Sequence, residues 1–377
     1  MVERIKALIY RLLANPVIRK VYVGTNRATL SVAGSNRLAS HTYHSVNPLP
    51  FSREQHAVLA GRKAYYEHLH RPGRSMVQLR RNVHRLEKGL LMEPPRPVFA
   101  KDYIGETVEF FEAATTERPN DSTIDRDEID WARDVLRAYF ARVTEDADVN
   151  RWRDRFQAQV SEEAPERQTL DSPTNPRTPF RRDISEPAVA YDDLLALAMQ
   201  RRSVRWFEQR QVPRDLIDKA LLIGRQSPTA CNRMPYEIRI FDDPTLVQKV
   251  ASIPFGAAGY SHNIPVIAVV IGKLDSYFSP RDRHAIYIDA SLAAMGFMYG
   301  LEAVGLSSSV INWPDFEPLE RKMQRTLGLE LSERPVMLIA LGYHDPDGLV
   351  AGSVKKELDT FRSYNVVNSA DVNETPS

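Results

Sequence analysis

Three arginines and a serine lie within five consecutive residues of this chain, in the stretch Arg201–Phe207, which reads RRSVRWF. Each guanidinium group presents a planar fork of N–H donors that matches two phosphate oxygens at once, and the Ser203 hydroxyl adds a short donor. The stretch therefore predicts an anion-clamping site directly after an apolar helical pattern. A solvated basic face without a ligand is the alternative, because runs of charge are usually plain surface.

A second stretch, residues 227–236, reads SPTACNRMPY and runs straight into the alternating sequence of residues 236–241. Its prolines and polar residues predict a loop, and the alternation predicts a strand after it. Asn232 could offer its amide as both donor and acceptor to the edge of a heteroaromatic ring, while Pro228 and Pro235 stiffen the loop around it. The alternative for Asn232 is an ordinary turn residue.

A third stretch, residues 289–306, is poor in charge and rich in Ala and Gly. This composition predicts a helix that is buried on most sides. We expect Asp289 to be its N-cap and Gly305 to end it. The small residues would let another backbone approach closely, which suits a central helix at a subunit or domain contact.

Taken in order, these stretches resemble the FMN-dependent nitroreductase family. The resemblance consists of an RRSxRxF opening, an SPxxxNxxPY loop, a DASxAA helix ending in GL, and a closing strand with Leu341-Gly342-Tyr343. It covers about residues 190–365, nearly half of the chain. It implies an α+β fold with a nitroreductase-like central mixed sheet flanked by helices, preceded by a mostly helical N-terminal region.

The resemblance also implies a set of cofactor-binding residues. Those expected at the ribityl phosphate and the pyrimidine edge of FMN are Arg201, Arg202, Ser203 and Arg205. The basic residues expected to complete the phosphate site, after the last core strand, are Lys355 and Lys356. The loop residues expected to reach the flavin from the second subunit of a homodimer are Pro228, Thr229, Ala230, Asn232 and Met234. Family members often have Gln where Met234 stands.

The chemistry implied is hydride transfer from NADH or NADPH to flavin N5, followed by reduction of an unidentified small-molecule acceptor in the same pocket. Because the cofactor carries this reaction, no catalytic acid or base is demanded of the protein. The stretch Ser309–Asp315 occupies the place where the family's backbone approaches flavin N5. The alternative is a non-catalytic flavin-binding or accessory protein that keeps the fold for interactions within a biosynthetic complex.

Other catalytic patterns are weak in this sequence. It contains neither a glycine-rich dinucleotide fingerprint nor a P-loop. Cys231 is the only cysteine, which excludes an internal disulfide and a multi-cysteine metal cluster, and we expect a small buried thiol rather than a redox nucleophile. His84 and Glu87 share a helix face at the spacing of carboxylate-bridged metal sites, but without partners they predict a polar patch or a domain contact, and no metal.

Composition agrees with a cytoplasmic enzyme of about two domains. The chain has 377 residues and a net charge of +1, so it has no basic footprint for nucleic acid. The low-charge residues 251–272 contain two prolines and predict a loop and a buried strand over 265–271, not a membrane span. Further strands are expected over 310–312 and 335–341, the latter a continuous apolar run.

The sequence of the N-terminal half predicts no function. Residues 1–160 are mostly helical in pattern, for example over 104–114 and 129–143, and their role is unknown. The first twenty residues predict an amphipathic helix that docks on the protein or, alternatively, touches a membrane surface. Arg11 interrupts any signal-peptide pattern there. We expect a Pro-rich linker over 161–188, the FMN-binding domain over 189–365, and a flexible tail over 366–377.

Overall fold

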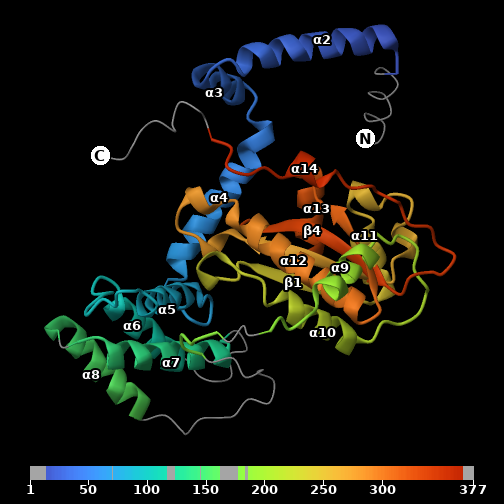
Figure 1. Ribbon diagram of the computed structural model, residues 1–377. Helices are drawn as coiled ribbons and strands as arrows, with labels where there is room; N and C mark the ends of the chain where they lie inside the picture. The colour runs from blue at the N-terminus through green and yellow to red at the C-terminus, as the bar shows by residue number, and fades with distance from the viewer. Residues whose placement is uncertain are drawn as a thin grey trace.

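The computed structural model of the protein describes residues 14–69, 71–116, 124–144, 146–161, 177–182 and 186–367. A sheet with helices on both faces forms the C-terminal half, and helices form the N-terminal half (Figure 1). The predicted α+β class and the helical N-terminal region are therefore confirmed. The predicted amphipathic helix falls largely on residues 1–13, outside the described residues.

The sheet has four strands in the order β1-β2-β4-β3. Their bounds are β1 Tyr236–Phe241, β2 Val266–Lys273, β3 Ser307–Asn312 and β4 Glu333–Gly342. All three neighbouring pairs are antiparallel, and the parallel component consists of an isolated bridge between Ser203 and Ser308. The central strand β2 is buried over seven consecutive residues, as a strand covered on both faces must be.

Helices cover both faces of this sheet. One face packs against α10 (Arg214–Gly224) and α12 (Ala285–Ala303), and the other packs against α11 (Pro244–Ala251) and α13 (Glu317–Leu327). Alternate residues of β2 point to the two cores: Ala268 belongs to the first core and Val269 to the second. The remaining elements of this half are α9 Tyr191–Gln200, α14 Leu358–Phe361 and the short 3-10 turns η1 Ala230–Asn232, η2 Phe255–Ala257, η3 Ser261–Asn263, η4 Leu274–Ser276 and η5 Pro280–Asp282.

Small residues bring α10 and α12 unusually close together. A Cβ atom added to Gly300 would lie 2.7 Å from backbone atoms of Ala220, and one added to Gly224 would lie 2.9 Å from the carbonyl oxygen of Ala293. The predicted close approach of a second backbone to this helix is thus confirmed. Gly305 follows the helix with φ +78°, a conformation that glycine adopts at no steric cost, and it ends the helix as predicted.

The N-terminal helices divide into three groups. The helices α2 (Pro16–Ala33) and α3 (Arg37–Val46) bury none of their residues and stand off the molecule (Figure 1). The helix α4 (Leu49–Glu67) packs against the sheet domain. The helices α5 (Val77–Leu90), α6 (Ile104–Thr116), α7 (Arg126–Arg142) and α8 (Ala147–Ser161) share a core of their own. The helices predicted over 104–114 and 129–143 are confirmed as α6 and α7.

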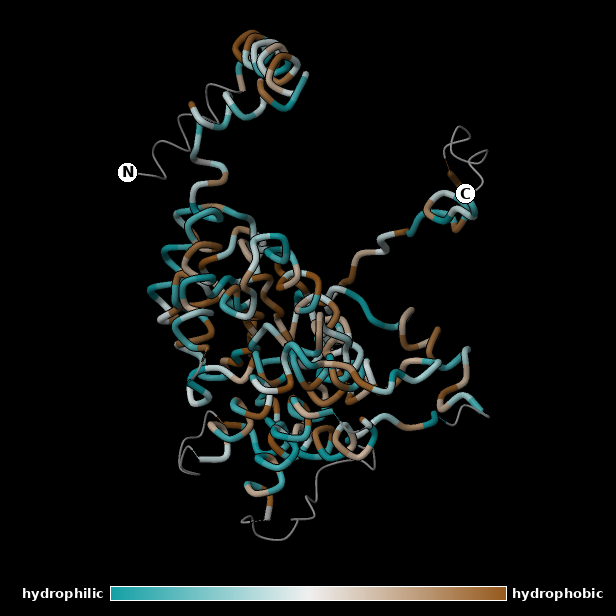
Figure 2. The backbone as a smooth tube through the Cα atoms, turned by 90° about the vertical axis from the view of Figure 1, so that its left-hand side faces the viewer, coloured by the Kyte–Doolittle hydropathy of each residue, from teal (hydrophilic) through white to brown (hydrophobic). Residues whose placement is uncertain are grey.

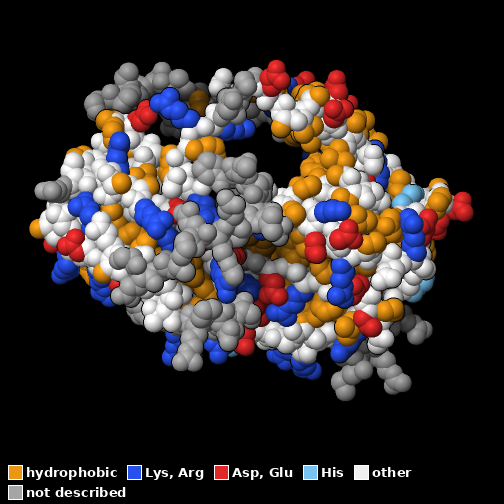
Figure 3. All heavy atoms as spheres, turned by 90° about the horizontal axis from the view of Figure 1, so that it is seen from below, with side chains coloured by type: hydrophobic (Ala, Val, Ile, Leu, Met, Phe, Trp, Pro, Cys, Tyr) orange, Lys and Arg blue, Asp and Glu red, His pale blue; other side chains and the backbone are white. Residues whose placement is uncertain are grey.

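Hydrophobic side chains remain exposed in several places. The tube view shows the segment before the C-terminus running away from the body (Figure 2). The space-filling view shows apolar side chains on the lower face (Figure 3). The segment includes Leu349, 91 % exposed, and Val354, 98 % exposed. Among the described residues, no helix has the length and hydropathy needed to cross a membrane.

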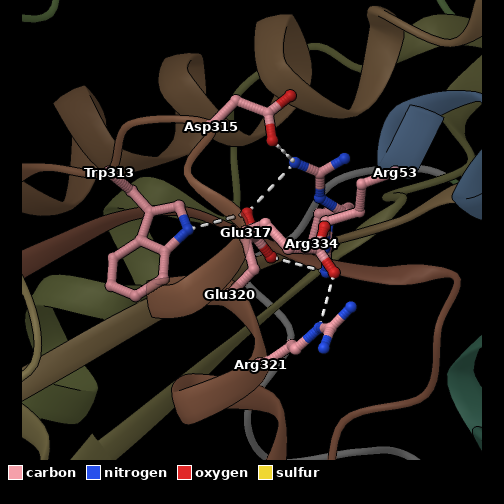
Figure 4. A network of polar contacts seen from close by, with 7 residues as sticks. All are labelled: Arg53, Trp313, Asp315, Glu317, Glu320, Arg321 and Arg334. Atoms are coloured by element: carbon pink, nitrogen blue, oxygen red, sulfur yellow. Dashed lines mark hydrogen bonds and ion pairs between the residues drawn. The ribbon is translucent and has the colours of Figure 1, made fainter. Parts of the chain in front are cut away.

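A buried network of charges joins α4 to the sheet domain (Figure 4). Arg53 of α4 pairs with the Glu320 carboxylate of α13 at 2.6 Å, and Arg334 of β4 pairs with the same carboxylate at 3.0 Å. Trp313 donates its indole N–H to that carboxylate across 2.9 Å, and Arg334 also reaches Asp315 at 3.1 Å. Because Glu320 is fully buried, these partners compensate for its desolvation.

Apolar packing also stabilises the contact between α4 and the sheet domain. Ala57 of α4 belongs to a small core with Leu274, Tyr277 and Ile286, and Gly61 lies directly over Leu274. The helix α4 is therefore packed into the domain that starts, by sequence pattern, near residue 189. Most of the predicted linker over 161–188 and the tail beyond residue 367 lie outside the described residues.

Candidate functional site

The arginine-rich stretch forms an extended segment against the edge strand β3. It begins where α9 ends, and the backbone N–H of Val204 donates to the carbonyl of Ser308 across 3.0 Å. Val204 and Phe207 point into the core, whereas Ser203 before them and Arg205 between them are exposed. The two buried residues thus fix the backbone and leave the polar side chains free to face a ligand.

The guanidinium groups of this stretch have unused donors. Arg202 reaches a backbone carbonyl at 3.5 Å and Arg205 reaches one at 3.4 Å, both within the stretch itself. In the described part of the chain, neither these two nor Arg201 forms an ion pair with a carboxylate. Arg205 also lies 5.9 Å from the Tyr260 ring. Several cations without carboxylate partners suit a phosphate group, which supplies the missing acceptors.

The loop Pro228–Met234 has an unusual backbone. Cys231, Asn232 and Met234 have φ angles of 55°, 52° and 49°, in the left-handed region that residues with a Cβ atom rarely occupy. Each such residue costs on the order of 1 kcal/mol or more, so surrounding contacts must fix the loop. Met234 donates its backbone N–H to the Thr229 hydroxyl across 3.1 Å, which closes the loop on itself.

Asp289 is the contact that joins this loop to α12. Its carboxylate accepts the backbone N–H of Ala230 across 2.8 Å and the Tyr277 hydroxyl across 3.4 Å. The prediction that Asp289 is the N-cap of the helix is wrong, because the helix begins at Ala285 after His284. Asp289 lies one turn inside, where burial raises the pKa of its carboxyl group and the Ala230 N–H bond partly opposes that rise.

A residue of the helical region also contacts the loop. Arg80 of α5 donates its Nε–H to the carbonyl oxygen of Asn232 across 2.7 Å, and its terminal nitrogen pairs with Glu128 of α7. Next in the loop, Arg233 is buried over the Tyr277 ring at 4.9 Å. Sequence analysis missed Arg80 entirely. No motif marks it, because its partner is a backbone carbonyl 152 residues away.

The side-chain amide of Asn232 keeps its hydrogen-bonding capacity. Asn232 is partly exposed, and its amide forms no hydrogen bond with any described residue. Pro228 and Ala230 are exposed, whereas Thr229 and Met234 are partly buried. Cys231 is partly exposed as well, so the prediction of a buried thiol is wrong.

The two predicted halves of the site lie at opposite ends of α12. Next to the arginine-rich stretch, Gln200 donates to Glu302 near the C-terminal end of the helix at 3.5 Å. The loop is tied to Asp289 near the N-terminal end. Thirteen residues separate Asp289 from Glu302 along α12, which corresponds to about 20 Å of helix. One chain therefore does not bring the arginines and Asn232 together.

The two lysines lie on the C-terminal segment. This segment starts beside the arginine-rich stretch, where Asp345 donates its N–H to the Trp206 carbonyl across 3.1 Å. Further along, Lys355 and Lys356 are exposed and form no hydrogen bond or ion pair with a described residue. The structure thus places both lysines on this C-terminal segment, with their side chains exposed.

A groove of about 610 Å³ runs beside the loop, between the helical region and the sheet domain. Its lining includes Met234 and Tyr236 of the loop and β1, and Leu221, Leu222 and Ala293 of α10 and α12. Asp127 at the start of α7 completes the rim. The groove shows that the helical region contributes to the surroundings of the predicted flavin loop.

The stretch Ser309–Asp315 forms the end of β3 and the turn after it. Ser309 and Ile311 are buried, and Trp313 and Asp315 enter the charge network around Glu320. This stretch is thereby connected to α4 through Arg53. Its approach to flavin N5 remains a prediction.

The other residues considered in the sequence have structural partners. His84 contacts Glu87 at 3.3 Å, and Glu87 also accepts the indole N–H of Trp131 across 2.9 Å, within the α5–α7 contact. His262 packs edge-on against Trp206 with 6.0 Å between ring centres. Among the described residues there is no group of three or more potential metal ligands.

The C-terminal half of the chain is similar to known proteins. A model described as "Nitroreductase family" matches residues 198–258 and 247–343. A protein of Methanothermobacter thermautotrophicus, named provisionally as an NADH dehydrogenase/NAD(P)H nitroreductase, is 24% identical over 156 residues, which cover 40% of this chain and 77% of that protein. An NADH dehydrogenase of Thermus thermophilus is 26% identical over 187 residues, which cover 41% of this chain and 89% of that protein.

Solved structures match the same half of the chain. An FMN-dependent nitroreductase from Clostridium difficile R20291 has 19% identity and a TM-score of 0.38, over 46% of this chain and 97% of that one. A nitroreductase family protein from Streptococcus pneumoniae TIGR4 has 18% identity and a TM-score of 0.40, over 45% of this chain and 99% of that one. From the family match and the motifs within it, the C-terminal half of this chain carries a domain of the nitroreductase family.

Proposed function

We propose that this protein is an FMN-dependent oxidoreductase that takes a hydride from NADH or NADPH and passes the electrons to a small-molecule acceptor. The observation that carries the proposal is a set of arginines that have no carboxylate partner in the described part of the chain, on an extended segment at the edge of a nitroreductase-family domain. The names of the two relatives, which refer to NADH and NAD(P)H, support the choice of electron donor.

The donor set fits FMN. Arg201, Arg202 and Arg205 have spare N–H donors for the phosphate, and the exposed Ser203 hydroxyl can approach the same oxygens. The free amide of Asn232 offers both a donor and an acceptor, as the polar edge of an isoalloxazine ring requires. When bound, FMN supplies the hydride-accepting and hydride-donating chemistry. The protein's residues bind the phosphate, orient the ring and restrict access of water.

We further propose a homodimer in which each site combines the arginines of one chain with the loop of the other. About 20 Å of α12 separates the two halves within one chain, so a second copy is needed to unite them. The helix α12 offers an apolar stripe with Ile288, Leu292, Met295 and Tyr299 at helical spacing, of which Ile288 is 60 % and Leu292 44 % exposed.

Neighbouring elements extend this apolar surface. Leu222 and Ile223 of α10, and Leu194 and Met199 of α9, each expose two fifths or more of their surface. Contiguous apolar surface of this kind marks an interaction site in soluble proteins. The projecting C-terminal segment carries Lys355 and Lys356 and could bring them to the partner's phosphate site.

Reconstitution with FMN tests the function directly. The full-length protein is mixed with FMN, freed of unbound cofactor, and its visible spectrum and molar mass are measured. We expect one FMN per chain in a particle of twice the chain mass. A dimeric protein that binds no flavin would instead support the accessory-protein alternative, and a flavin-loaded monomer would contradict the shared site.

A further inference from the structure

We propose that Arg80, in the helical region that precedes the nitroreductase-family domain, is a positioning residue for the flavin loop. The inference rests on the proposed function and deepens it, because it assigns a role in cofactor binding to a region outside the family match at residues 198–343. Arg80 does not touch the cofactor site itself. It acts through the backbone of Asn232, whose side-chain amide is the group proposed to face the ring.

The contact between Arg80 and Asn232 is short and largely buried. The Nε–H of Arg80 lies 2.7 Å from the Asn232 carbonyl oxygen, and the side chain of Arg80 is 11% exposed. Glu128 pairs with the other end of the guanidinium group, and the Trp131 ring lies 5.6 Å from it. Both partners belong to α7, so the core of α5–α8 fixes the arginine before it meets the loop.

The loop needs an external contact at this point. Asn232 lies between two other left-handed residues, Cys231 and Met234. The domain's own hydrogen bonds fix N–H groups of the loop: those of Ala230 and Met234 donate to the side chains of Asp289 and Thr229, and that of Asn232 donates to the Thr229 carbonyl across 3.0 Å. Arg80 holds the carbonyl of the peptide group between Asn232 and Arg233, whereas the N–H of that peptide group donates to the Ala230 carbonyl across 3.4 Å. Because the Cα atom of Asn232 carries both this carbonyl group and the side chain, the Arg80 bond restricts the position from which the amide can reach a ligand.

A purely structural role for Arg80 is the competing interpretation. In that case the arginine would serve only to neutralise Glu128, a carboxyl group whose pKa burial raises. The two roles separate experimentally, because Glu128→Gln removes the charge of the partner and leaves the Arg80 donor to Asn232 in place. A positioning role also predicts partial rescue by lysine, which keeps the charge but lacks the planar fork.

The experiment uses the full-length chain and the variants Arg80→Met, Arg80→Lys, Glu128→Gln and the double variant Arg80→Met with Glu128→Gln. The double variant leaves no unpaired buried charge, so it folds even where Arg80→Met is destabilised. Arg85→Met is the matched control, because Arg85 lies on the same helix, stacks on Tyr103 at 3.5 Å and is 32% exposed.

The FMN dissociation constant, the position of the flavin absorption bands and the flavin midpoint potential are measured for each variant, and circular dichroism checks the fold. We expect Arg80→Met and the double variant to weaken FMN binding by about tenfold, the effect of losing one charge-assisted hydrogen bond, and to shift the bands and the potential. Arg80→Lys should recover part of the affinity. Glu128→Gln, whose amide oxygen can still accept from Arg80, should lose much less affinity than Arg80→Met, and Arg85→Met should match the wild type.

Hydrogen exchange of the flavin-free protein adds a readout that does not depend on the cofactor. We expect faster exchange in peptides covering residues 228–236 in Arg80→Met and in the double variant, and unchanged exchange there in Arg85→Met. Wild-type protein that binds FMN, together with a folded double variant of unchanged affinity, spectrum and loop exchange, would overturn the role of Arg80 alone. Wild-type protein that binds no FMN would overturn the proposed function and the inference that rests on it.

Discussion

The backbone N–H of Ala230 donates to the carboxylate of Asp289 across 2.8 Å, although 59 residues separate the two along the chain. This bond ties a strained loop to the helix at the centre of the domain. It makes the geometry of the loop a property of α12, and Arg80 of the helical region adds a contact on the other side. The predicted flavin loop is thus fixed from two directions.

Asp289→Asn tests the first of these contacts through its pH dependence. The amide oxygen can still accept the Ala230 N–H, but the side chain no longer ionises. Burial raises the pKa of Asp289, so the folded state binds the proton more tightly and the wild type loses stability as pH rises from about 4 through that pKa. Asp289→Asn does not lose stability in this way as the pH rises, because residue 289 no longer titrates.

The measurement is urea unfolding of both proteins between acidic and neutral pH. The stability of Asp289→Asn relative to the wild type should increase with pH and then level off. A relative stability that decreases over this range would mean that the carboxyl pKa is lowered, and it would contradict the assignment.

Arg201→Ala combined with Arg205→Ala should weaken FMN binding by at least about 100-fold, because each charge-assisted phosphate contact contributes roughly 1.5 to 3 kcal/mol. Fluorescence titration of FMN measures the effect. Arg210→Ala is the control: Arg210 is a nearby arginine, but it already pairs with Glu208 at 2.7 Å and stacks on Tyr343. Equal affinities in all three proteins would remove the phosphate assignment.

Arg53→Met should lower the free energy of unfolding by about 2 kcal/mol, because it leaves the buried Glu320 carboxylate with one cation in place of two. Arg321→Met provides the comparison within the same network. Arg321 pairs with Glu317 on the surface, so its loss should cost less than about 0.5 kcal/mol. Denaturant unfolding distinguishes the two, and equal effects would show that the α4 contact contributes little.

Two truncations test how the N-terminal half is divided. Deletion of residues 1–47 removes α2 and α3, which bury no residue, and should leave the fold and FMN binding unchanged. Deletion of residues 1–185 also removes α4 and Arg80, exposes Leu274 and Ile286, and should give an unstable protein. Size-exclusion chromatography and FMN titration provide the readouts. A stable, flavin-binding product of the longer deletion would contradict the integration of α4.

The strands and helices of the domain were largely predictable because their patterns are local. Alternation marked β1, low charge marked the region of β2, and a continuous apolar run marked β4. The start of β3 was not predictable in the same way. Its first residues are serines, and Ser308 is fully buried by pairing with Leu341, so tertiary contact overrides a polar sequence there.

The site residues divide along the same line. The arginine-rich stretch and the loop could be identified as candidates because their residue types and spacing resemble the motifs of a known family. The role of Asp289 could not be predicted. An Asp near the start of a helix is usually its N-cap, whereas the partner of Asp289 is the backbone N–H of Ala230 in a distant loop. Arg80 gave no signal at all, because a helical arginine that donates to a distant backbone carbonyl looks like any surface arginine.

The central claim is that the protein carries FMN and reduces it with a nicotinamide nucleotide. The most direct test is the visible absorption spectrum of the full-length protein supplied with FMN, followed under anaerobic conditions during titration with NADPH and with NADH. We predict bound flavin whose absorption bands bleach with at least one of the two nucleotides. A purified, folded protein that retains no flavin, or whose bound flavin neither nucleotide reduces, would contradict the claim.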